Sequence, residues 1–241
     1  MDPLTALAAS GLRSRMESLD LLANNLANSS SPGFKSDREF YGVYRAMEAG
    51  DSDTSMPTLD RHWTDFSQGA LEPTNSPLDV ALSGKGFFAV QGPSGPLYTR
   101  NGNFRLSPAG QLVTAEGYPV RGTGGTTLTL GSGRTAEISA DGTVQQDGTI
   151  IGQLEIVDFT STAGLGKQGK AYFRNLDPQM NPAAAGATVV QGKLEASNVG
   201  SAESAVGLVH VMRQFEILQK AVSMGGEMNR RAIEEVARVG S

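Results

Sequence analysis

The chain has 241 residues, with 20 Lys and Arg against 25 Asp and Glu, so its formal net charge is −5. This mildly acidic balance argues against proteins that bind nucleic acids or anionic membranes, because both classes normally carry a basic surplus. There is no cysteine and there are only two histidines, His62 and His210, which excludes disulfide frameworks, thiol nucleophiles and metal centres rich in cysteine or histidine.

Residues 1–28 are predicted to form one helix within an N-terminal segment 1–34. Pro3 suits the first helical position, where no backbone donor is needed, and the breaker Ser29–Gly33 is expected to end the helix. Apolar side chains recur at steps of three and four residues, a seam typical of a helix that packs against another helix. The seam residues are Leu12, Met16, Leu19, Ala23 and Leu26.

Residues 35–68 are interpreted as a connector with extended or partly irregular structure, and residues 69–195 as a β-rich domain. Short strand-like runs closed by turn residues recur through this domain, which is long enough to bury a core. The predicted strands are Leu78–Leu82, Phe87–Gln91, Leu97–Arg100, Gln111–Thr114, Thr126–Leu130, Ala136–Ser139, Thr143–Gln146 and Ile150–Val157. Asp141-Gly142 and Asp147-Gly148 have the sequence of tight hairpin turns.

Residues 199–238 are predicted to form a second helix within a C-terminal segment 196–241. Ser201 is its expected N-cap, and Gly225-Gly226 is a weak point at which a bend is expected. One apolar stripe consists of Leu208, Met212, Phe215 and Val222.

The predicted fold class is therefore α+β, with the terminal helices pairing as a coiled-coil-like stalk and a central, mostly antiparallel β-domain. Two interpretations stay open. In the first, the chain is an assembly subunit whose remaining apolar surface meets copies of itself or other proteins. In the second, the helices form a hairpin packed on the β-domain of a monomer.

No catalytic, cofactor or metal site is predicted, and the chain is not expected to be an enzyme. The run Gly122–Gly125 lacks the Lys-Ser/Thr pair of a phosphate-binding loop, and the tight turns account for Asp141 and Asp147. No secretory signal peptide and no membrane-spanning stretch are recognised, so a simple interpretation of location is cytoplasmic.

Several motifs in register resemble those of the bacterial flagellar axial proteins, which build the rod and hook. The N-terminal signature is carried by Ala23–Asn28 followed by Pro32–Lys35, and the entry to the β-domain by Pro77–Leu82 and Tyr98–Phe104. Leu194–Val199 resembles the segment before the C-terminal helix of the family. The motif residues taken from the resemblance are Asn24, Asn25, Asn28, Gly33, Phe34 and Asn198.

The resemblance implies a structural subunit of the flagellar basal-body rod, which polymerises helically with other rod proteins and with itself to transmit torque. It also implies export by the flagellar type III apparatus without a cleaved signal peptide, and no cofactor. Arg213–Glu216 resembles the proximal-rod type, and the distal-rod type is the alternative. A β-domain binding module or enzyme with helical oligomerisation arms is the alternative from another class.

Overall fold

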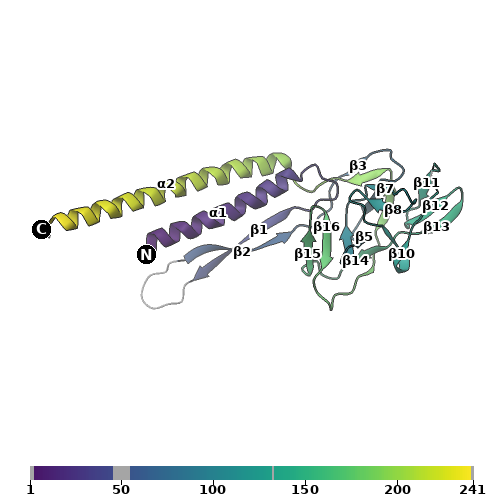
Figure 1. Cartoon of the computed structure of the whole chain (residues 1–241), viewed down its shortest axis with the longest axis horizontal. Coiled ribbons are helices and arrows are strands. Elements are labelled where there is room, and N and C mark those ends of the chain that lie inside the picture. The colour runs from purple at the N-terminus through teal and green to yellow at the C-terminus, as the bar shows by residue number, and fades with distance from the viewer. Residues whose placement is uncertain (1–2, 46–54, 132, 240–241) are drawn as a thin grey trace. The chain divides into compact units, whose positions relative to one another are not determined.

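A computed structural model of the protein describes residues 3–45, 55–131 and 133–239. Its two long helices, α1 (Pro3–Ala27) and α2 (Ser201–Val239), confirm the two helices predicted at the ends of the chain. Alpha2 continues as one helix through Gly225-Gly226, so this weak point does not end it (Figure 1). The described residues group into two compact units.

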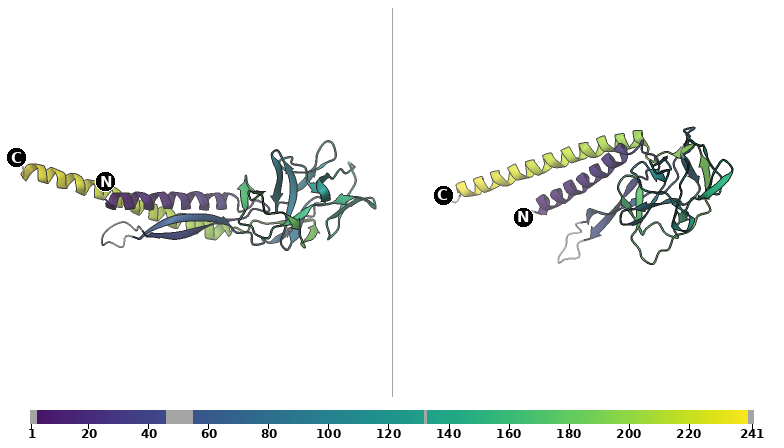
Figure 2. Two further views of the ribbon diagram at one scale, coloured as in Figure 1. Left: turned by 90° about the horizontal axis from the view of Figure 1, so that it is seen from below. Right: turned by 45° about the vertical axis from the view of Figure 1, so that its right-hand side comes forward.

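The first unit consists of α1, α2 and a two-stranded antiparallel hairpin of β1 (Asp37–Arg45) and β2 (Ser55–Thr64). The helices pack against each other, and both strands contact α1 (Figures 1 and 2). The Thr64 hydroxyl donates to Asp37 Oδ1 at 2.7 Å near the open end of the hairpin. Much of the segment interpreted as a connector is therefore paired strand, while residues 46–54 lie outside the described residues.

The second unit, residues 28–36 and 65–199, is a β-rich body in which every strand pairing described is antiparallel. Its six-stranded sheet has the order β15-β16-β6-β5-β14-β17, and a three-stranded sheet has the order β11-β12-β13. The remaining strands pair as β3 with β19, β4 with β18, β7 with β8 and β9 with β10.

The strand bounds are β3 Leu71–Pro73, β4 Val80–Ser83, β5 Phe87–Gly92, β6 Gly95–Thr99, β7 Phe104–Leu106, β8 Leu112–Thr114, β9 Arg121–Gly122, β10 Thr126–Thr127, β11 Ala136–Ile138, β12 Thr143–Gln146, β13 Thr149–Gln153, β14 Ile156–Asp158, β15 Leu165–Gln168, β16 Tyr172–Asn175, β17 Ala183–Ala184, β18 Thr188–Gln191 and β19 Lys193–Glu195. One 3-10 turn, Thr123–Gly125, separates β9 from β10.

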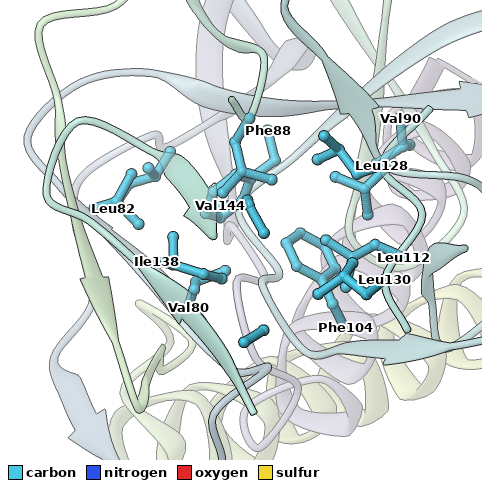
Figure 3. Close-up of a cluster of buried hydrophobic side chains, with 14 of the residues drawn as sticks. Val80, Leu82, Phe88, Val90, Phe104, Leu112, Leu128, Leu130, Ile138 and Val144 are labelled. Carbon is cyan, nitrogen blue, oxygen red and sulfur yellow. The ribbon is translucent and has the colours of Figure 1, made fainter. Parts of the chain in front are cut away.

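The six-stranded sheet separates two hydrophobic clusters, because alternate residues of a strand point to opposite faces. From β5, Phe88 and Val90 enter the larger cluster, while Phe87 and Ala89 enter the smaller one. Figure 3 shows Phe88, Phe104 and Leu112 converging in the larger cluster with side chains from the smaller sheets. In the smaller cluster the Phe87 and Phe173 rings lie 5.8 Å apart, centroid to centroid. The six-stranded sheet is therefore buried on both faces, with one cluster on each.

The predicted strands agree with the structure where turn residues bound them on both sides. The predicted strand Thr143–Gln146 is β12, and Asp147 (φ 52°) and Gly148 (φ 76°) form the predicted tight turn. The predicted strand Ile150–Val157 is wrong as one element: it is divided between β13 and β14, which belong to different sheets, and the buried Leu154 between them bridges to Gly122. Of the predicted strand Thr126–Leu130, only Thr126–Thr127 is strand.

Replacing Leu97 by alanine is expected to destabilise the β-body by about 2–5 kcal/mol, because this buried leucine leaves a cavity in the larger cluster. Leu176→Ala is the matched control: Leu176 is 67% exposed, so its loss is expected to cost under about 0.5 kcal/mol. Urea denaturation of the purified chain measures both. Equal effects would contradict this description of the core.

Candidate assembly surface and buried ion-pair cluster

The predicted seam of α1 is only partly covered within the first unit. Leu12, Leu19 and Leu26 are half-buried, whereas Ala23 is exposed and Met16 is 54% exposed. The most buried side chains of α1 are instead polar and small, namely Ser14, Ser18 and Asn25. The seam thus lies at the edge of the contact with the rest of the unit, and part of it faces outward.

The predicted stripe of α2 is divided in the same way. Leu208, Phe215 and Val222 are half-buried, while Met212 is 48% exposed. A buried residue that the stripe omits, Val211, lies near the centre of the covered face. The structure therefore brings part of each predicted stripe to the helix pair and leaves both methionines exposed.

Small residues lie in the contact between the two helices. A Cβ placed on Gly11 would lie 3.7 Å from Leu218 Cδ1, and one on Gly207 would lie 3.6 Å from both methyl groups of Leu22. Each glycine of one helix therefore lies beside a leucine of the other. The serines Ser14 and Ser18 add no bulk to the same region of α1.

The structure reveals a second apolar stripe on α2 that the sequence analysis missed. At 3.6 residues per turn its members lie within about 40° of one another and about 130° from Val211 on the covered face. They are Val206, Ile217, Met224 and Met228, all exposed by more than 60%. The available signal was the spacing of 11 residues from 206 to 217 and from 217 to 228, which is three helical turns. Exposed apolar side chains therefore lie on a second side of α2, which the single chain does not cover and which also carries the exposed polar residues His210 and Arg213.

The motif residues at the end of α1 organise the start of the hairpin. Asn25 is buried and bridges the backbone of Asp37: its Nδ2 donates to Asp37 O at 2.7 Å, and its Oδ1 accepts from Asp37 N at 3.0 Å. Asn24 is exposed on the helix. An amide side chain suits this bridge, because it carries a donor and an acceptor on two separate atoms.

Asn28, Gly33 and Phe34 belong to the β-body. Asn28 Oδ1 accepts from the Ser31 hydroxyl at 3.2 Å, and Gly33 N donates to Glu195 O at 2.7 Å. Phe34 is buried, and Lys167 Nζ lies 4.2 Å from the centre of its ring, a cation–π contact. Gly33 has a φ of 68°, and a Cβ there would collide with the backbone of Arg100 and Asn101. Only glycine fits this position.

The central feature of the β-body is a cluster of three buried charges, Lys35, Arg100 and Glu195, which we call the ion-pair cluster. Lys35 Nζ lies 2.5 Å from Glu195 Oε1, and Arg100 Nη1 lies 3.1 Å from Glu195 Oε2. Arg100 follows β6, and Glu195 ends β19, which pairs with β3 at Leu71. The cluster therefore joins three segments that are far apart in sequence.

Backbone groups complete the ion-pair cluster. Gly69 N donates to Glu195 Oε1 at 3.0 Å, Lys35 donates to Ser67 O at 2.6 Å, and Arg100 Nη2 donates to Gly84 O at 2.7 Å. Burial lowers the pKa of Lys35 and of Arg100, and the neighbouring Glu195 carboxylate opposes that shift in both. These hydrogen bonds offset the cost of removing the charges from water.

Asn198 ties the end of this region to the segment around residue 66. Its Nδ2 donates to Asp65 O at 2.7 Å and to Ser67 Oγ at 3.1 Å, and its Oδ1 accepts from Ser36 N at 2.7 Å. The motif residues Gly33, Phe34 and Asn198 thus surround the ion-pair cluster. The sequence analysis quoted the motifs that contain Lys35, Arg100 and Glu195 but assigned those residues no role. The available signal was that each of the three motifs contains one charged residue among uncharged ones, and that the single negative charge could pair with the two positive ones.

Within the part of the chain that the structure describes, no group of three His, Asp or Glu side chains has the arrangement of a metal site. His62 is exposed, and His210 Nε2 lies 2.9 Å from Gln214 Nε2 on the surface of α2. Neither of the two described helices is long and apolar enough to cross a bilayer.

Glu195→Gln is expected to destabilise the β-body by about 3–5 kcal/mol, because it leaves two buried cations without a counter-charge. Asp147→Asn is the matched control, since it breaks an exposed pair with Arg134 and is expected to cost under about 1 kcal/mol. Denaturation followed by near-UV circular dichroism, which senses the buried Tyr98 and Tyr172, measures both. A Glu195→Gln protein as stable as the control would refute the role of the cluster.

Gly33→Ala is expected to cost more than about 3 kcal/mol, because backbone strain is added to a collision with residues 100 and 101. Gly117→Ala separates the two effects: Gly117 also has a positive φ (91°) but has open space around it, so only strain of about 1–2 kcal/mol is expected. Thermal unfolding of the two variants gives the comparison. Equal losses would mean that the close approach at Gly33 contributes nothing.

Comparison with known proteins agrees with this arrangement. Residues 81–151 match the flagellar hook protein FlgE/F/G D1 domain, and residues 190–235 match the flagellar basal body rod FlgEFG protein C-terminal family. The flagellar basal-body rod protein FlgF of Caulobacter vibrioides is 32% identical over 92% of each chain. FlgG of Buchnera aphidicola subsp. Schizaphis graminum is also 32% identical, over 95% of this chain and 97% of its own. FlgF of Salmonella typhimurium is 31% identical over 87% of this chain and 88% of its own.

These relatives span nearly the whole chain, and the two family matches cover part of the β-body and most of α2. The chain therefore belongs to the flagellar basal-body rod protein family.

Proposed function

We propose that this chain is a structural subunit of the flagellar basal-body rod, which polymerises helically with other rod proteins and with copies of itself. The observation that carries the proposal is the uncovered apolar stripe Val206, Ile217, Met224 and Met228 on α2. One side of α2 packs on α1, and the side with this stripe, about 130° around the helix, has no cover within the described residues. Large apolar side chains that a single chain leaves exposed at several positions of one helix are typical of a surface that meets neighbouring subunits.

In this proposal α1 and α2 pair as a coiled-coil-like stalk and line the inner tube of the rod, while the β-domain at 69–195 forms the outer layer. Head-to-tail contacts between different surfaces generate an open helical filament rather than a closed ring. Torque is then carried by many contacts repeated along the filament. No chemical step is needed, and no cofactor is proposed.

We further propose the FlgF type, which belongs to the proximal rod, on the basis of Arg213-Gln214-Phe215-Glu216 in α2. FlgG, the distal-rod protein, is the second candidate, since relatives of both names are equally similar to the chain. Crosslinking in intact basal bodies separates them, because a proximal and a distal subunit have different rod neighbours.

The proposal also includes the route to this location. The chain would be exported unfolded by the flagellar type III apparatus, without a cleaved signal peptide, and would reach the periplasm-spanning rod. Helices that become ordered only on contact with neighbours would limit polymerisation before export.

The test of the proposal is mass spectrometry of hook–basal bodies purified from the native bacterium. We expect the chain in the rod fraction. Its absence from intact basal bodies of cells that express it would overturn the rod assignment.

Ile217→Asp is expected to abolish assembly and motility without unfolding the monomer, because Ile217 is 66% exposed in the single chain and the new charge would be buried only in the rod. Ser223→Asp is the matched control: it adds the same charge six residues along, at an exposed polar position that belongs to neither stripe, and is expected to retain motility. Motility assays of the complemented deletion strain compare the two.

Substitutions in the predicted stripes, Leu19→Asp and Phe215→Asp, are also expected to abolish assembly. Both residues are half-buried, so the fold of these variants must be checked by circular dichroism. Normal motility with Ile217→Asp would show that the second stripe is not an assembly surface.

A further inference from the structure

The methionines whose exposure the structure describes are exposed on the helices and buried in the β-body. On α1 and α2, Met16, Met212, Met224 and Met228 are 54%, 48%, 63% and 70% exposed. In the β-body, Met180 is 8% exposed and packs in the smaller hydrophobic cluster. The exposed methionines thus lie on the elements proposed to carry assembly.

We propose that Met224 and Met228 form an oxidation-sensitive site that controls assembly, a proposal that rests on the rod function above. Met224 and Met228 lie on the uncovered stripe of α2, one helical turn apart. Their thioethers are therefore open to a dissolved oxidant in the free subunit and covered in the polymer.

The reaction is a two-electron oxygen transfer from a peroxide. The thioether sulfur attacks one oxygen of hydrogen peroxide, the O–O bond breaks, and an S–O bond forms as water leaves. The sulfur is oxidised and the peroxide is reduced, so the step needs no other reactant. Methionine sulfoxide is polar, and placing it against an apolar neighbour opposes the contact.

Methionine has a physical advantage over other apolar residues on a surface that contacts several partners. Its unbranched side chain adapts to partner surfaces of different shape, which suits a subunit that meets both its own copies and other rod proteins. Leucine would provide similar apolar area but cannot be oxidised. Adaptability and sensitivity to oxidation therefore come from the same side chain.

The first measurement treats the purified full-length chain with hydrogen peroxide and follows each methionine by peptide mass spectrometry. The four helical methionines are expected to form sulfoxide at least about fivefold faster than Met180, since susceptibility follows exposure. Met180 serves as an internal control in the same sample. Equal rates at all five positions would overturn the proposal.

The second measurement applies the same treatment to purified basal bodies. Met224 and Met228 are expected to be oxidised at least about fivefold more slowly than in the free chain, while the rate at Met180 stays unchanged. Rapid oxidation of Met224 and Met228 in basal bodies that contain the chain would overturn this inference and leave the rod assignment intact. Absence of the chain from basal bodies would overturn the rod assignment itself.

The third measurement compares two pairs of substitutions at the same positions in cells. Met224→Leu with Met228→Leu keeps the apolar surface and is expected to support motility and to make assembly insensitive to peroxide treatment of the free chain. Met224→Gln with Met228→Gln imitates the polarity of the sulfoxide and is expected to abolish motility. Motility of the glutamine variant equal to that of the leucine variant would overturn the proposal.

Discussion

The β-body depends on the burial of one carboxylate, that of Glu195, between Lys35 and Arg100. Desolvation of these charges is expensive, so the site is stable only as a complete set with its backbone donors. Because Lys35 lies where the chain enters the body and Glu195 where it leaves, the two passages are tied together at one place. Gly33 and Asn198 reinforce this: Gly33 N donates to Glu195 O, and Asn198 joins Ser36 to the segment at 65–67. The ion-pair cluster thereby fixes which segments meet, which apolar side chains at these three positions would not do.

The contact between α1 and α2 does not depend on buried charges. Their mutual contact uses glycine and serine, with Gly11 and Gly207 each beside a leucine of the other helix, and most of their apolar side chains are left at the edges or outside. A monomer selected only for stability would cover Ile217 and Met228. Leaving them exposed is costly in water and favours association. The apolar surface that the single chain does not cover is therefore best explained by a partner in the polymer.

The sequence patterns predicted the elements whose signals are local. The bounds of α1 follow from Pro3 and from the breaker after residue 28. The turn at Asp147-Gly148 follows from its Asp-Gly sequence, which suits the positive φ angles found there. The covered face of α1 could not be predicted from apolar periodicity, because Ser14 and Ser18 are buried there. The strands β18 and β19 were missed because their runs are short and are completed by distant partners, β4 and β3. The strands β15 and β16 pair with each other, but each has only four residues. The ion-pair cluster was missed for the same reason, since Lys35 and Glu195 are 160 residues apart.

The buried ion-pair cluster and the exposed apolar side chains of α2 have different roles: the first fixes the fold of the β-body, and the second provides a surface for neighbouring subunits. Charges inside the β-body have a strict geometry, so the body tolerates little rearrangement at Glu195. Apolar side chains on α2 are non-directional, and methionine adds flexibility, so the same face can accept neighbours that are related but not identical. If polar groups carried the uncovered stripe instead, each neighbour would have to supply matching partners, and the repeated contacts of a mixed filament would be harder to satisfy. Geometric precision therefore belongs inside the subunit, and adaptability belongs between subunits.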